Sequence, residues 1–466
     1  ASGLADKVLE GLAEVAYQAR DLGAMKHGDS TLINLYLLRQ VMMRYLPEAA
    51  LSVFEDYCLN ANGLLLAIGS RRLPDRPANE EPVMCFAFPH LSFEEYLASQ
   101  YIATLDNPEE ALAQRNAASD RWFYAGLFLG EQYALVTPKR AKNMLEMFHQ
   151  LLKDGAAWRN VWLAGVLWPL FCAEFPERRG DHAALEGRVR ERLTTLCATG
   201  QLLPPERADA GRVLSELGDP RNLEELVAIP QGPFIMGSKE EGPGLDERPQ
   251  HEVVIPYNYK IGKYPVTVKL WKRFADEAKY DQRDSDSLKG YDNHPAHDVS
   301  WHDACNFCQW LTDVWRKEGK ISGSEEARLP TEAEWERAAR DTDGREWPWG
   351  DTFEENRANT DESGIRRTTA VGIFPAGESP AKCLDMIGNV WEWTISLGAE
   401  YQDKSYAKRV REFKYPYNSE DGREDMRASD TFSRVVRGGS FRRPHGFARC
   451  ACRIDHYFDH PFNRYG

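Results

Sequence analysis

Residues 434–466 read R-V-V-R-G-G-S-F-R-R-P-H-G-F-A-R-C-A-C-R-I-D-H-Y-F-D-H-P-F-N-R-Y-G. Val435 and Val436 carry β-branched side chains that favour a strand, and the pair Gly438-Gly439 permits backbone angles closed to other residues. Aromatic, Arg and His side chains then follow without a helical or strand period. This mixture supplies contact area and directional polar groups, whereas a disordered tail would lack the aromatics. The segment predicts a strand, a turn and an irregular recognition surface; the alternative is an aromatic-rich core packed under loops.

Length, charge and hydropathy narrow the class of protein. The 466 residues suffice for about two to four domains. A formal net charge of −14 and a sequence pI of about 5.4 argue against nonspecific nucleic-acid binding, which needs a basic face. No apolar run is long enough for a membrane span, and the first residues lack the pattern of a signal peptide. We therefore expect a cytoplasmic protein without nucleic-acid or membrane partners.

The nine cysteines are scattered, and an odd number leaves at least one of them unpaired. In a long chain without a visible signal peptide, reduced and buried thiols are the expected state. Cys305-x-x-Cys308 lies inside D-A-C-N-F-C-Q-W-L, which reads as a helix. No second Cys or His pair follows at zinc spacing, so the sequence predicts no metal site there.

The first 106 residues read as mostly helical, with apolar side chains recurring on one helix face. Strand-like pieces at 63–68 and 83–88 flank a polar, Pro-rich loop. Helices followed by two strands predict a small winged-helix-like unit. Ser92 with Glu95 three residues later predicts a capping box at the start of the next helix.

The stretch F-A-F-P-H-L-S-F-E-E-Y-L-A at 86–98 resembles the region just downstream of the ATPase module in NACHT-type STAND proteins. The residues that carry this likeness are Phe88, His90, Leu91, Ser92, Phe93, Glu95, Tyr96, Leu97 and Ala98. No G-x-x-x-x-G-K-[ST] phosphate cradle occurs, so no nucleotide hydrolysis is expected. The resemblance implies an upstream STAND-type ATPase or effector as partner, and His90 is interpreted as a structural residue at a helix start.

Residues 107–226 continue as apolar-rich helices separated by polar turns. The last helix lies between Pro205 and Pro220, where proline and glycine punctuate its ends. The stretch R-A-D-A-G-R-V-L-S-E-L-G-D-P-R at 207–221 resembles the connector that precedes the next domain in related STAND fusions. We expect a STAND-derived domain at 1–106, a helical spacer at 107–226 and a third domain at 227–466.

Residues 227–466 change to strands and two clear helices. Two strand pairs are predicted at 227–238 and 251–267. Ser300 begins one helix as its cap, and Thr331, with Glu334 three residues later, begins a second.

This ordered set resembles the formylglycine-generating-enzyme (sulfatase-modifying-factor) domain, a large variant of the C-type lectin fold. The residues that carry the likeness are Pro265-Val266-Thr267, Trp301, 329–340, Asn389, Trp391, Glu392, Trp393 and Gly438-Gly439-Ser440. The expected fold class is α+β: an all-helical N-terminal half with the small winged-helix-like unit, then a C-type-lectin-like domain with a variable segment at 440–466. The family continues past the glycine matched by Gly466 with a closing strand, without which its neighbour strand would be an exposed edge.

The resemblance does not extend to the ligands of the family's chemistry. Formylglycine-generating enzymes bind copper(I) through a cysteine pair soon after Gly-Gly-Ser, and thiolate suits that soft metal; here the first cysteine after that motif is Cys450. The related sulfoxide synthases use a His-rich iron site in an N-terminal helical domain. The four histidines between 1 and 226 are isolated in sequence: His27, His90, His149 and His182. We predict no enzyme; the alternative is a metal-dependent oxidase with relocated ligands.

Another branch of the same superfamily, the variable proteins of diversity-generating retroelements, binds ligands through a mutable C-terminal surface. The invariant framework positions of those proteins resemble the following residues of this chain: Gly438-Gly439-Ser440-Phe441, Arg449-Cys450-Ala451, Arg453, Pro461, Arg464 and Gly466. The residues between would be the diversified, ligand-binding ones: Arg442, Arg443, His445, Gly446, Phe447, Cys452, Ile454, Asp455, His456, Tyr457, Phe458, Asp459, His460, Phe462, Asn463 and Tyr465. Adenine-directed mutagenesis of Asn codons yields these amino-acid types.

The predicted function is therefore non-catalytic recognition of a protein ligand, since aromatic and Arg anchors suit protein surfaces. The other alternative is a fixed sensor or scaffold part of a STAND-type signalling or defence complex. No cofactor is required, but the resemblance implies structural calcium. Asn389, Glu392 and the backbone near Val390 would form one site, and Asn359 with Asp361 a second. The competing interpretation is that these groups hydrogen-bond loop backbone.

Overall fold

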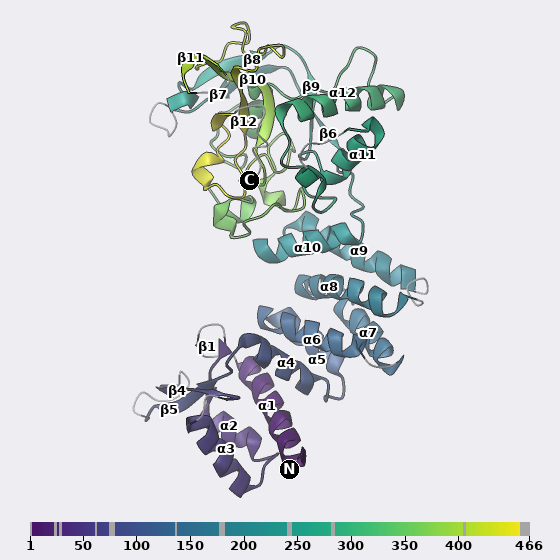
Figure 1. The fold of residues 1–466 in the computed structure, drawn as a ribbon, viewed down its shortest axis with the longest axis vertical. Helices are drawn as coiled ribbons and strands as arrows, with labels where there is room; N and C mark the ends of the chain where they lie inside the picture. The colour runs from purple at the N-terminus through teal and green to yellow at the C-terminus, as the bar shows by residue number, and fades with distance from the viewer. Residues whose placement is uncertain are drawn as a thin grey trace. The chain divides into compact units, whose positions relative to one another are not determined.

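The computed structural model describes residues 2–22, 26–27, 30–60, 63–73, 80–135, 138–176, 182–239, 245–280, 285–403 and 407–456. The chain forms two compact units, Ala1–Arg192 and Leu193–Gly466 (Figure 1). The domain boundaries expected after residues 106 and 226 stay predictions. Arg20 donates across the first to the backbone carbonyl of Arg121, and Arg207 donates across the second to the carbonyl of Ile373 at 2.9 Å.

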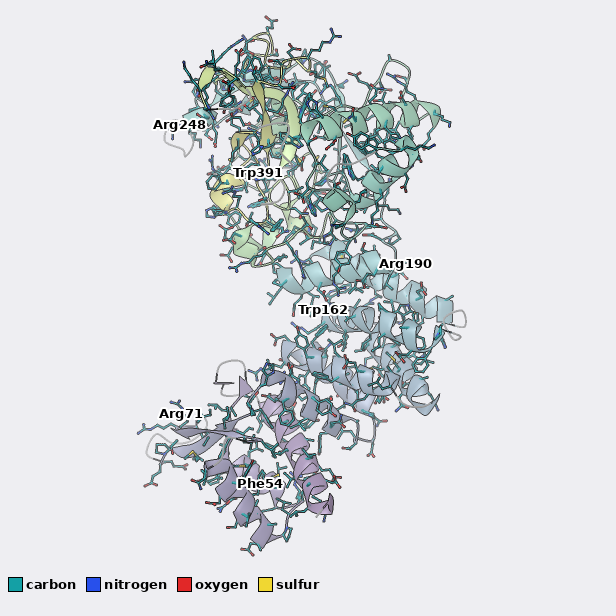
Figure 2. All side chains as sticks on the ribbon, in the orientation of Figure 1. Phe54, Arg71, Trp162, Arg190, Arg248 and Trp391 are labelled. Carbon is teal, nitrogen blue, oxygen red and sulfur yellow. The ribbon has the colours of Figure 1, made fainter. Side chains whose placement is uncertain are left out.

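The N-terminal unit begins with the winged-helix-like arrangement that the sequence predicts. Its elements are α1 (Ser2–Leu22), β1 (Lys26–His27), β2 (Ser30–Thr31), β3 (Ile33–Asn34), α2 (Leu35–Met42), α3 (Glu48–Asn60), β4 (Leu66–Arg71) and β5 (Val83–Ala87). Strands β3, β5 and β4 form an antiparallel sheet in that order, with β5 in the centre. Arg71 lies on β4 at the edge of this unit (Figure 2).

Helix α4 (Leu91–Ile102) has its N-cap two residues earlier than predicted. His90, not Ser92, is the N-cap, and its Nδ1 accepts the backbone N–H of Ser92 at 3.1 Å. Glu95 does not complete a capping box but pairs with Arg20 at 3.0 Å, beside Glu94 at 2.7 Å. A buried arginine between two carboxylates competes successfully for the glutamate, because leaving that cation unpaired would cost more than a cap contributes.

The rest of the unit is helical. Its elements are α5 (Pro108–Ala118), η1 (Asp120–Trp122), α6 (Phe123–Ala134), α7 (Pro138–Leu151), α8 (Trp158–Glu174) and α9 (Ala183–Thr199), which continues past the boundary. Gly126 and Gly130 let α6 approach α8 closely, since a Cβ at either position would collide with Leu163 or Leu167. Trp162 lies in the interior that results (Figure 2).

The C-terminal unit combines helices with small antiparallel sheets. Its helices are α10 (Pro204–Glu216), α11 (Val268–Ala278), α12 (Trp301–Lys317) and α13 (Glu332–Arg340), with short 3-10 turns η4 (Leu245–Glu247), η5 (Ser285–Leu288), η6 (Glu355–Arg357), η7 (Asp361–Ser363), η8 (Pro375–Gly377) and η9 (His445–Phe447). Its strands are β6 (Leu226–Ile229), β7 (Gly232–Met236), β8 (His251–Ile255), β9 (Tyr259–Gly262), β10 (Glu392–Tyr401), β11 (Arg409–Glu412), β12 (Phe432–Arg437) and β13 (Arg453–His456).

Pairing in this unit is antiparallel throughout the named strands. The main sheet has the order β11-β10-β12-β13, while β6 pairs with β9 and β7 with β8. The predicted caps of α12 and α13 are confirmed: Ser300 and Thr331 both form capping boxes, with Asp303 and Glu334. The core between these helices and the sheet is rich in tryptophan: Trp271, Trp301, Trp315, Trp391 and Trp393.

No helix within the described part of the chain is long and apolar enough to cross a membrane.

The corrected cap of α4 can be tested directly. His90→Ala is expected to lower the free energy of unfolding of the N-terminal unit by about 1 kcal/mol, the usual contribution of an N-cap. Ser92→Ala, a matched truncation two residues away, is expected to change it by less than about 0.5 kcal/mol. Urea denaturation of the full chain measures both. A larger effect at Ser92 than at His90 would restore the sequence-based assignment.

Candidate ligand-recognition surface

A double-glycine turn directs the C-terminal segment out of the sheet. After β12, Gly438 and Gly439 adopt φ values of +94° and +76°, which other residues rarely tolerate. A Cβ on Gly439 would lie 2.8 Å from the Cβ of Ala448, so the turn also depends on close approach. The chain returns as β13, which pairs with β12 from Arg437↔Arg453 to Arg434↔His456. Residues 438–452 therefore form an irregular excursion between two neighbouring strands.

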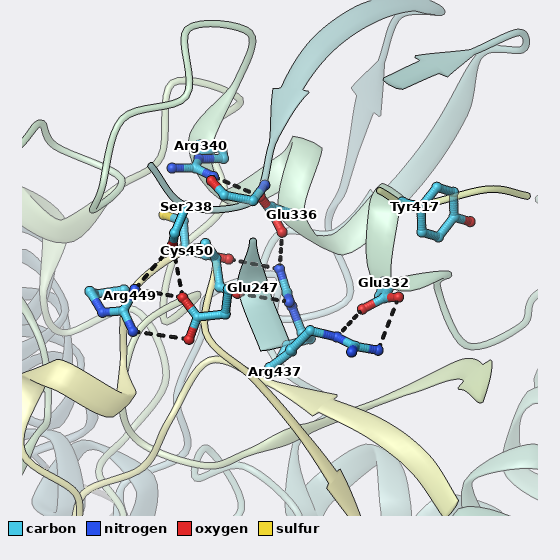
Figure 3. A network of polar contacts seen from close by, with 12 residues as sticks. Ser238, Glu247, Glu332, Glu336, Arg340, Tyr417, Arg437, Arg449 and Cys450 are labelled. Atoms are coloured by element: carbon cyan, nitrogen blue, oxygen red, sulfur yellow. Dashed lines mark hydrogen bonds and ion pairs between the residues drawn. The ribbon is translucent and has the colours of Figure 1, made fainter. Parts of the chain in front are cut away.

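A buried ion pair fixes the base of this excursion. Arg437 of β12 and Glu336 of α13 are both fully buried and joined through Nη2 and Oε2 (Figure 3). The same guanidinium donates to the carbonyls of Cys450 at 2.8 Å and Ala451 at 3.2 Å. Glu336 also accepts from Arg340 at 2.7 Å. One arginine thus holds the start and the end of the excursion to the same helix.

Two further carboxylates hold arginines of the returning chain (Figure 3). Glu247 accepts from Arg449 at 2.6 and 3.0 Å, a bidentate arrangement. Glu332 accepts from Arg453 at 2.9 Å and from Arg423 at 3.1 Å. Burial acts to raise the pKa of Glu332, but the surrounding arginines outweigh it and hold that pKa below its ordinary value. The carboxylate is therefore charged and paired at neutral pH.

Five predicted ligand-binding residues project from this anchored base: Arg442, Arg443, His445, Gly446 and Phe447. All except the half-buried Arg443 are exposed, and the exposed fraction of Phe447 is 43%. His445 stacks on Phe353 with ring centroids 4.5 Å apart, and its Nδ1 lies 2.6 Å from Oε1 of Glu362. These residues form what we call the displayed surface, residues 442–447.

The other described positions do not face outward freely. Cys452 is buried in the tryptophan-rich core, and Ile454 packs against the same cluster. Asp455 accepts from Ser433 at 2.8 Å and from Arg409 at 3.1 Å, while His456 is half-buried. Cys452 was predicted to be a displayed residue, and the structure corrects this: the thiol lies where the chain re-enters the core before β13.

The remaining predicted ligand-binding positions lie outside the described residues: Tyr457, Phe458, Asp459, His460, Phe462, Asn463 and Tyr465.

The predicted calcium ligands Asn389 and Asn359 are engaged with the protein itself. Oδ1 of Asn389 accepts the backbone N–H of Thr369 at 3.0 Å, and its Nδ2 donates to the Thr369 carbonyl. Nδ2 of Asn359 donates to the carbonyl of Arg367, and its Oδ1 accepts from Ser363. The geometry thus corresponds to the competing interpretation, in which these amides hydrogen-bond to loop groups.

The acidic residues of the two predicted calcium sites, Glu392 and Asp361, are not part of a cage of metal ligands. Glu392 accepts the indole N–H of Trp335 at 3.0 Å, and burial raises its pKa to about 7. Val390 is buried and Asp361 is exposed at the start of η7. Within the described ranges, no three His, Cys, Asp or Glu side chains gather around a point that suits a metal ion. Calcium also binds backbone carbonyl and amide oxygens, so calcium binding stays a prediction.

All nine cysteines lie in described parts of the chain, and none forms a disulfide. Burial raises the pKa of Cys450 and Cys452 to about 12, and that of Cys305 and Cys308 to the same value. Thiols with such pKa values are protonated at neutral pH.

An apolar cavity of about 630 Å³ lies elsewhere in the unit, lined by β6, β9, α11 and α12 together with Trp391 and Trp393. None of residues 440–456 lines it, so it adds no group to the displayed surface.

The structure adds neighbours that the sequence analysis missed. Helix η7 contacts the displayed surface, because the backbone N–H of Asp361 donates to the carbonyl of Arg443 at 3.1 Å. This brings Glu362 beside His445, and the loop that follows η7 carries the exposed Arg366 and Arg367. No local pattern could have signalled this contact, since the two segments are some eighty residues apart in the chain.

Comparison with known proteins identifies the C-terminal unit. The family of the sulfatase-modifying factor enzyme 1-like domain matches residues 215–466, and the chain belongs to this family. The hercynine oxygenase of Mycolicibacterium smegmatis is 29% identical over 289 residues, which are 53% of this chain and 60% of that protein. The inactive C-alpha-formylglycine-generating enzyme 2 of Bos taurus is 29% identical over 278 residues, 48% of this chain and 85% of that protein.

Two other similarities cover the same half. The serine/threonine-protein kinase pkn1 of Chlamydia pneumoniae is 31% identical over 50% of this chain and 35% of that protein. The chain thus spans less than two thirds of the oxygenase and of the kinase. Among solved structures, Treponema denticola variable protein 1 matches with a TM-score of 0.37 and 18% identity, over 50% of this chain and 89% of that chain.

Removing the central anchor is expected to destabilise the C-terminal unit. Arg437→Met leaves a fully buried carboxylate with one partner fewer and two carbonyls without a donor, so the free energy of unfolding should fall by about 3–5 kcal/mol. Arg427→Met, at an exposed arginine of the same unit, is expected to change it by less than about 0.5 kcal/mol. Urea denaturation followed by tryptophan fluorescence measures both, and equal effects would refute the role given to Arg437.

A buried glutamate near these anchors predicts a pH dependence. Burial raises the pKa of Glu424 from 4.5 to about 7, while Tyr417 and Ser396 donate to it. Its contribution to stability is therefore full below pH 4.5 and is lost as pH rises through about 7. Glu424→Gln, which stays neutral, should remove this part of the slope in unfolding measured from pH 4 to 8, whereas Glu420→Gln at an exposed position should not. An unchanged slope in Glu424→Gln would contradict the assignment.

Proposed function

We propose that this chain is a non-catalytic recognition protein that binds a protein ligand through the displayed surface, and that the C-terminal segment is diversified as in retroelement variable proteins. The observation that carries the proposal is the separation between anchored and displayed side chains. Arg437, Arg449 and Arg453 are held by buried carboxylates, while residues 442–447 project from the same excursion without serving the core. Side chains on such a base can change without loss of the fold.

The family membership supports this proposal without proving it. One relative is an inactive formylglycine-generating enzyme by its name, so the domain occurs without that activity. The buried, protonated thiols of this chain agree with a binding role.

The hercynine oxygenase relatives favour a second candidate, a metal-dependent oxidase. This candidate needs ligands supplied from an arrangement that the described residues do not show. Stoichiometric uptake of iron or copper by the purified full chain, measured by elemental analysis, would support the oxidase and count against the binding proposal.

For the N-terminal unit we propose a STAND-derived origin and an upstream ATPase or effector as partner. The proposal rests on the resemblance of residues 86–98 and on the helices followed by the antiparallel β4–β5 hairpin. An Arg20→Met variant, which leaves the buried Glu94 and Glu95 without their cation and so destabilises the unit, would show whether this unit must be intact for partner binding.

Tolerance of the displayed surface is the direct test of the proposal. A variant with Arg442, Arg443, His445 and Phe447 all changed to Ala should unfold within about 1–2 kcal/mol of the wild type, because none of these side chains is fully buried. Arg449→Ala, which removes one anchor from the same excursion, should cost about 3 kcal/mol or more. Urea denaturation compares them, and a fourfold variant that fails to fold would assign these residues to the core instead.

Diversification itself is tested at the gene. A near-copy of its last segment beside a reverse transcriptase, differing at adenines that encode residues 442–465, is the expected finding. A gene without such a copy would leave a fixed sensor with one dedicated partner.

A further inference from the structure

Helix η7 lies against the displayed surface. The backbone N–H of Asp361 donates to the carbonyl of Arg443 at 3.1 Å, and Glu362 accepts the backbone N–H of His445 at 2.9 Å and contacts its ring nitrogen. The loop that follows η7 carries Arg366 and Arg367, and Asn359 holds this loop through the backbone carbonyl of Arg367 at 2.9 Å. In Figure 1 the yellow turn at 445–447 lies beside the light green turns formed by residues 355–377. A ligand that touches residues 442–447 therefore lies against η7, and Arg366 and Arg367 follow η7 directly in the chain.

Four arginines on this face have no carboxylate partner among the described residues: Arg366, Arg367, Arg442 and Arg443. The first three are exposed and the fourth is half-buried. The neighbouring arginines of the unit behave differently, because Arg345, Arg357 and Arg449 are each paired with an acid within 3.0 Å. These two segments thus carry four cations without a carboxylate partner, on a chain of net charge −14.

The acids on the same turns do not cancel this charge. Glu354 pairs with Arg357 at 2.9 Å, whereas Glu362 accepts from His445 and keeps its negative charge. Glu355 and Asp361 are exposed, so four arginines without an acid partner stand against three carboxylates of η6 and η7 that have no arginine or lysine partner in the described parts of the chain. The local field is positive, which attracts acidic ligands and repels basic ones.

The guanidinium groups of Arg442 and Arg443 are positioned by aromatic rings, which leaves their N–H donors available. Arg442 lies over the ring of Phe441 at 5.4 Å, and Arg443 over the ring of Phe447 at 5.7 Å. A guanidinium on an aromatic face keeps its edge N–H groups free, and these match a carboxylate in a bidentate fashion. Arginine is also among the residues that contribute most to protein interfaces.

Resting on the proposed function, we infer that the recognition surface includes Arg366 and Arg367, and that its protein ligand presents a cluster of carboxylates to these four arginines. A carboxylate cluster on a protein fits better than a nucleic acid, because an extended phosphate backbone needs a long basic face and the rest of this chain is acidic.

The inference is tested with poly-L-glutamate as probe for the full chain in biolayer interferometry at low and moderate salt. The wild type should bind, and binding should weaken as salt rises. Arg367→Glu combined with Arg442→Glu should weaken binding by about tenfold or more, since two attractive contacts become repulsive. The matched control is Arg71→Glu with Arg72→Glu, an exposed pair on and beside β4 of the N-terminal unit, which should leave binding unchanged.

Equal losses in the two double variants would overturn the assignment to this face. Tighter binding of a single-stranded DNA oligonucleotide than of poly-L-glutamate would overturn the carboxylate preference. The variant Arg366→Lys with Arg367→Lys keeps the charge and removes the fork, and its affinity should fall between those of the wild type and the charge-reversed variant.

Panning a random peptide library on the full chain distinguishes a failure of the acidic-ligand inference from a failure of the proposed recognition function. Enrichment of Asp- and Glu-rich peptides that is lost with Arg367→Glu/Arg442→Glu supports both. Enrichment of neutral, apolar peptides that depends on Phe447 keeps the recognition function and refutes the acidic ligand. The absence of any enriched peptide counts against both.

Discussion

The C-terminal unit depends on one buried charge pair, Glu336 with Arg437. Taking both charges out of water is costly, and only good geometry with full hydrogen bonding compensates for it. The pair comes close to that condition: the guanidinium also donates to the carbonyls of Cys450 and Ala451, and the carboxylate also accepts from Arg340 and the backbone N–H of Gly237, while Nε of Arg437 has no hydrogen-bond partner among the described residues. A helix, two strands and an irregular excursion are thereby tied to one point.

Three buried arginine–glutamate pairs stabilise the excursion in this way, and each glutamate comes from a distant part of the chain. Glu247, Glu332 and Glu336 hold Arg449, Arg453 and Arg437 across separations of 202, 121 and 101 residues. The long separations mean that the excursion takes shape only when the whole unit has folded. Between these anchors, the exposed side chains owe their positions to the backbone and little to one another.

The sequence analysis predicted features that depend on neighbouring residues and missed features that depend on packing between distant segments. The capping boxes at Ser300 and Thr331 were predictable because each needs only its neighbours three residues on. The cap of α4 was misplaced because Glu95 is drawn to Arg20, a contact between distant helices. Burial of Cys452 and the approach of η7 to the displayed surface depend on sheet register and loop packing, which no short pattern encodes.

The start of the C-terminal domain likewise depends on packing that the sequence pattern does not show. Composition changes near residue 227, but α10 already belongs with the domain that follows, because Arg207 and Gly211 pack against Ile373 and Ala370. The residues matched by the family begin at 215, between the predicted and the observed boundary.

The thiols of the C-terminal unit have a practical consequence. Burial keeps Cys197, Cys305, Cys308, Cys383, Cys450 and Cys452 protonated near neutral pH, each with its pKa raised to about 12. Alkylating reagents attack thiolates, so these six side chains are poor targets under mild conditions. A single cysteine introduced at the exposed Gly446 would therefore be the preferred labelling site of this unit, and a fluorophore there would report ligand contact without prior removal of the native cysteines.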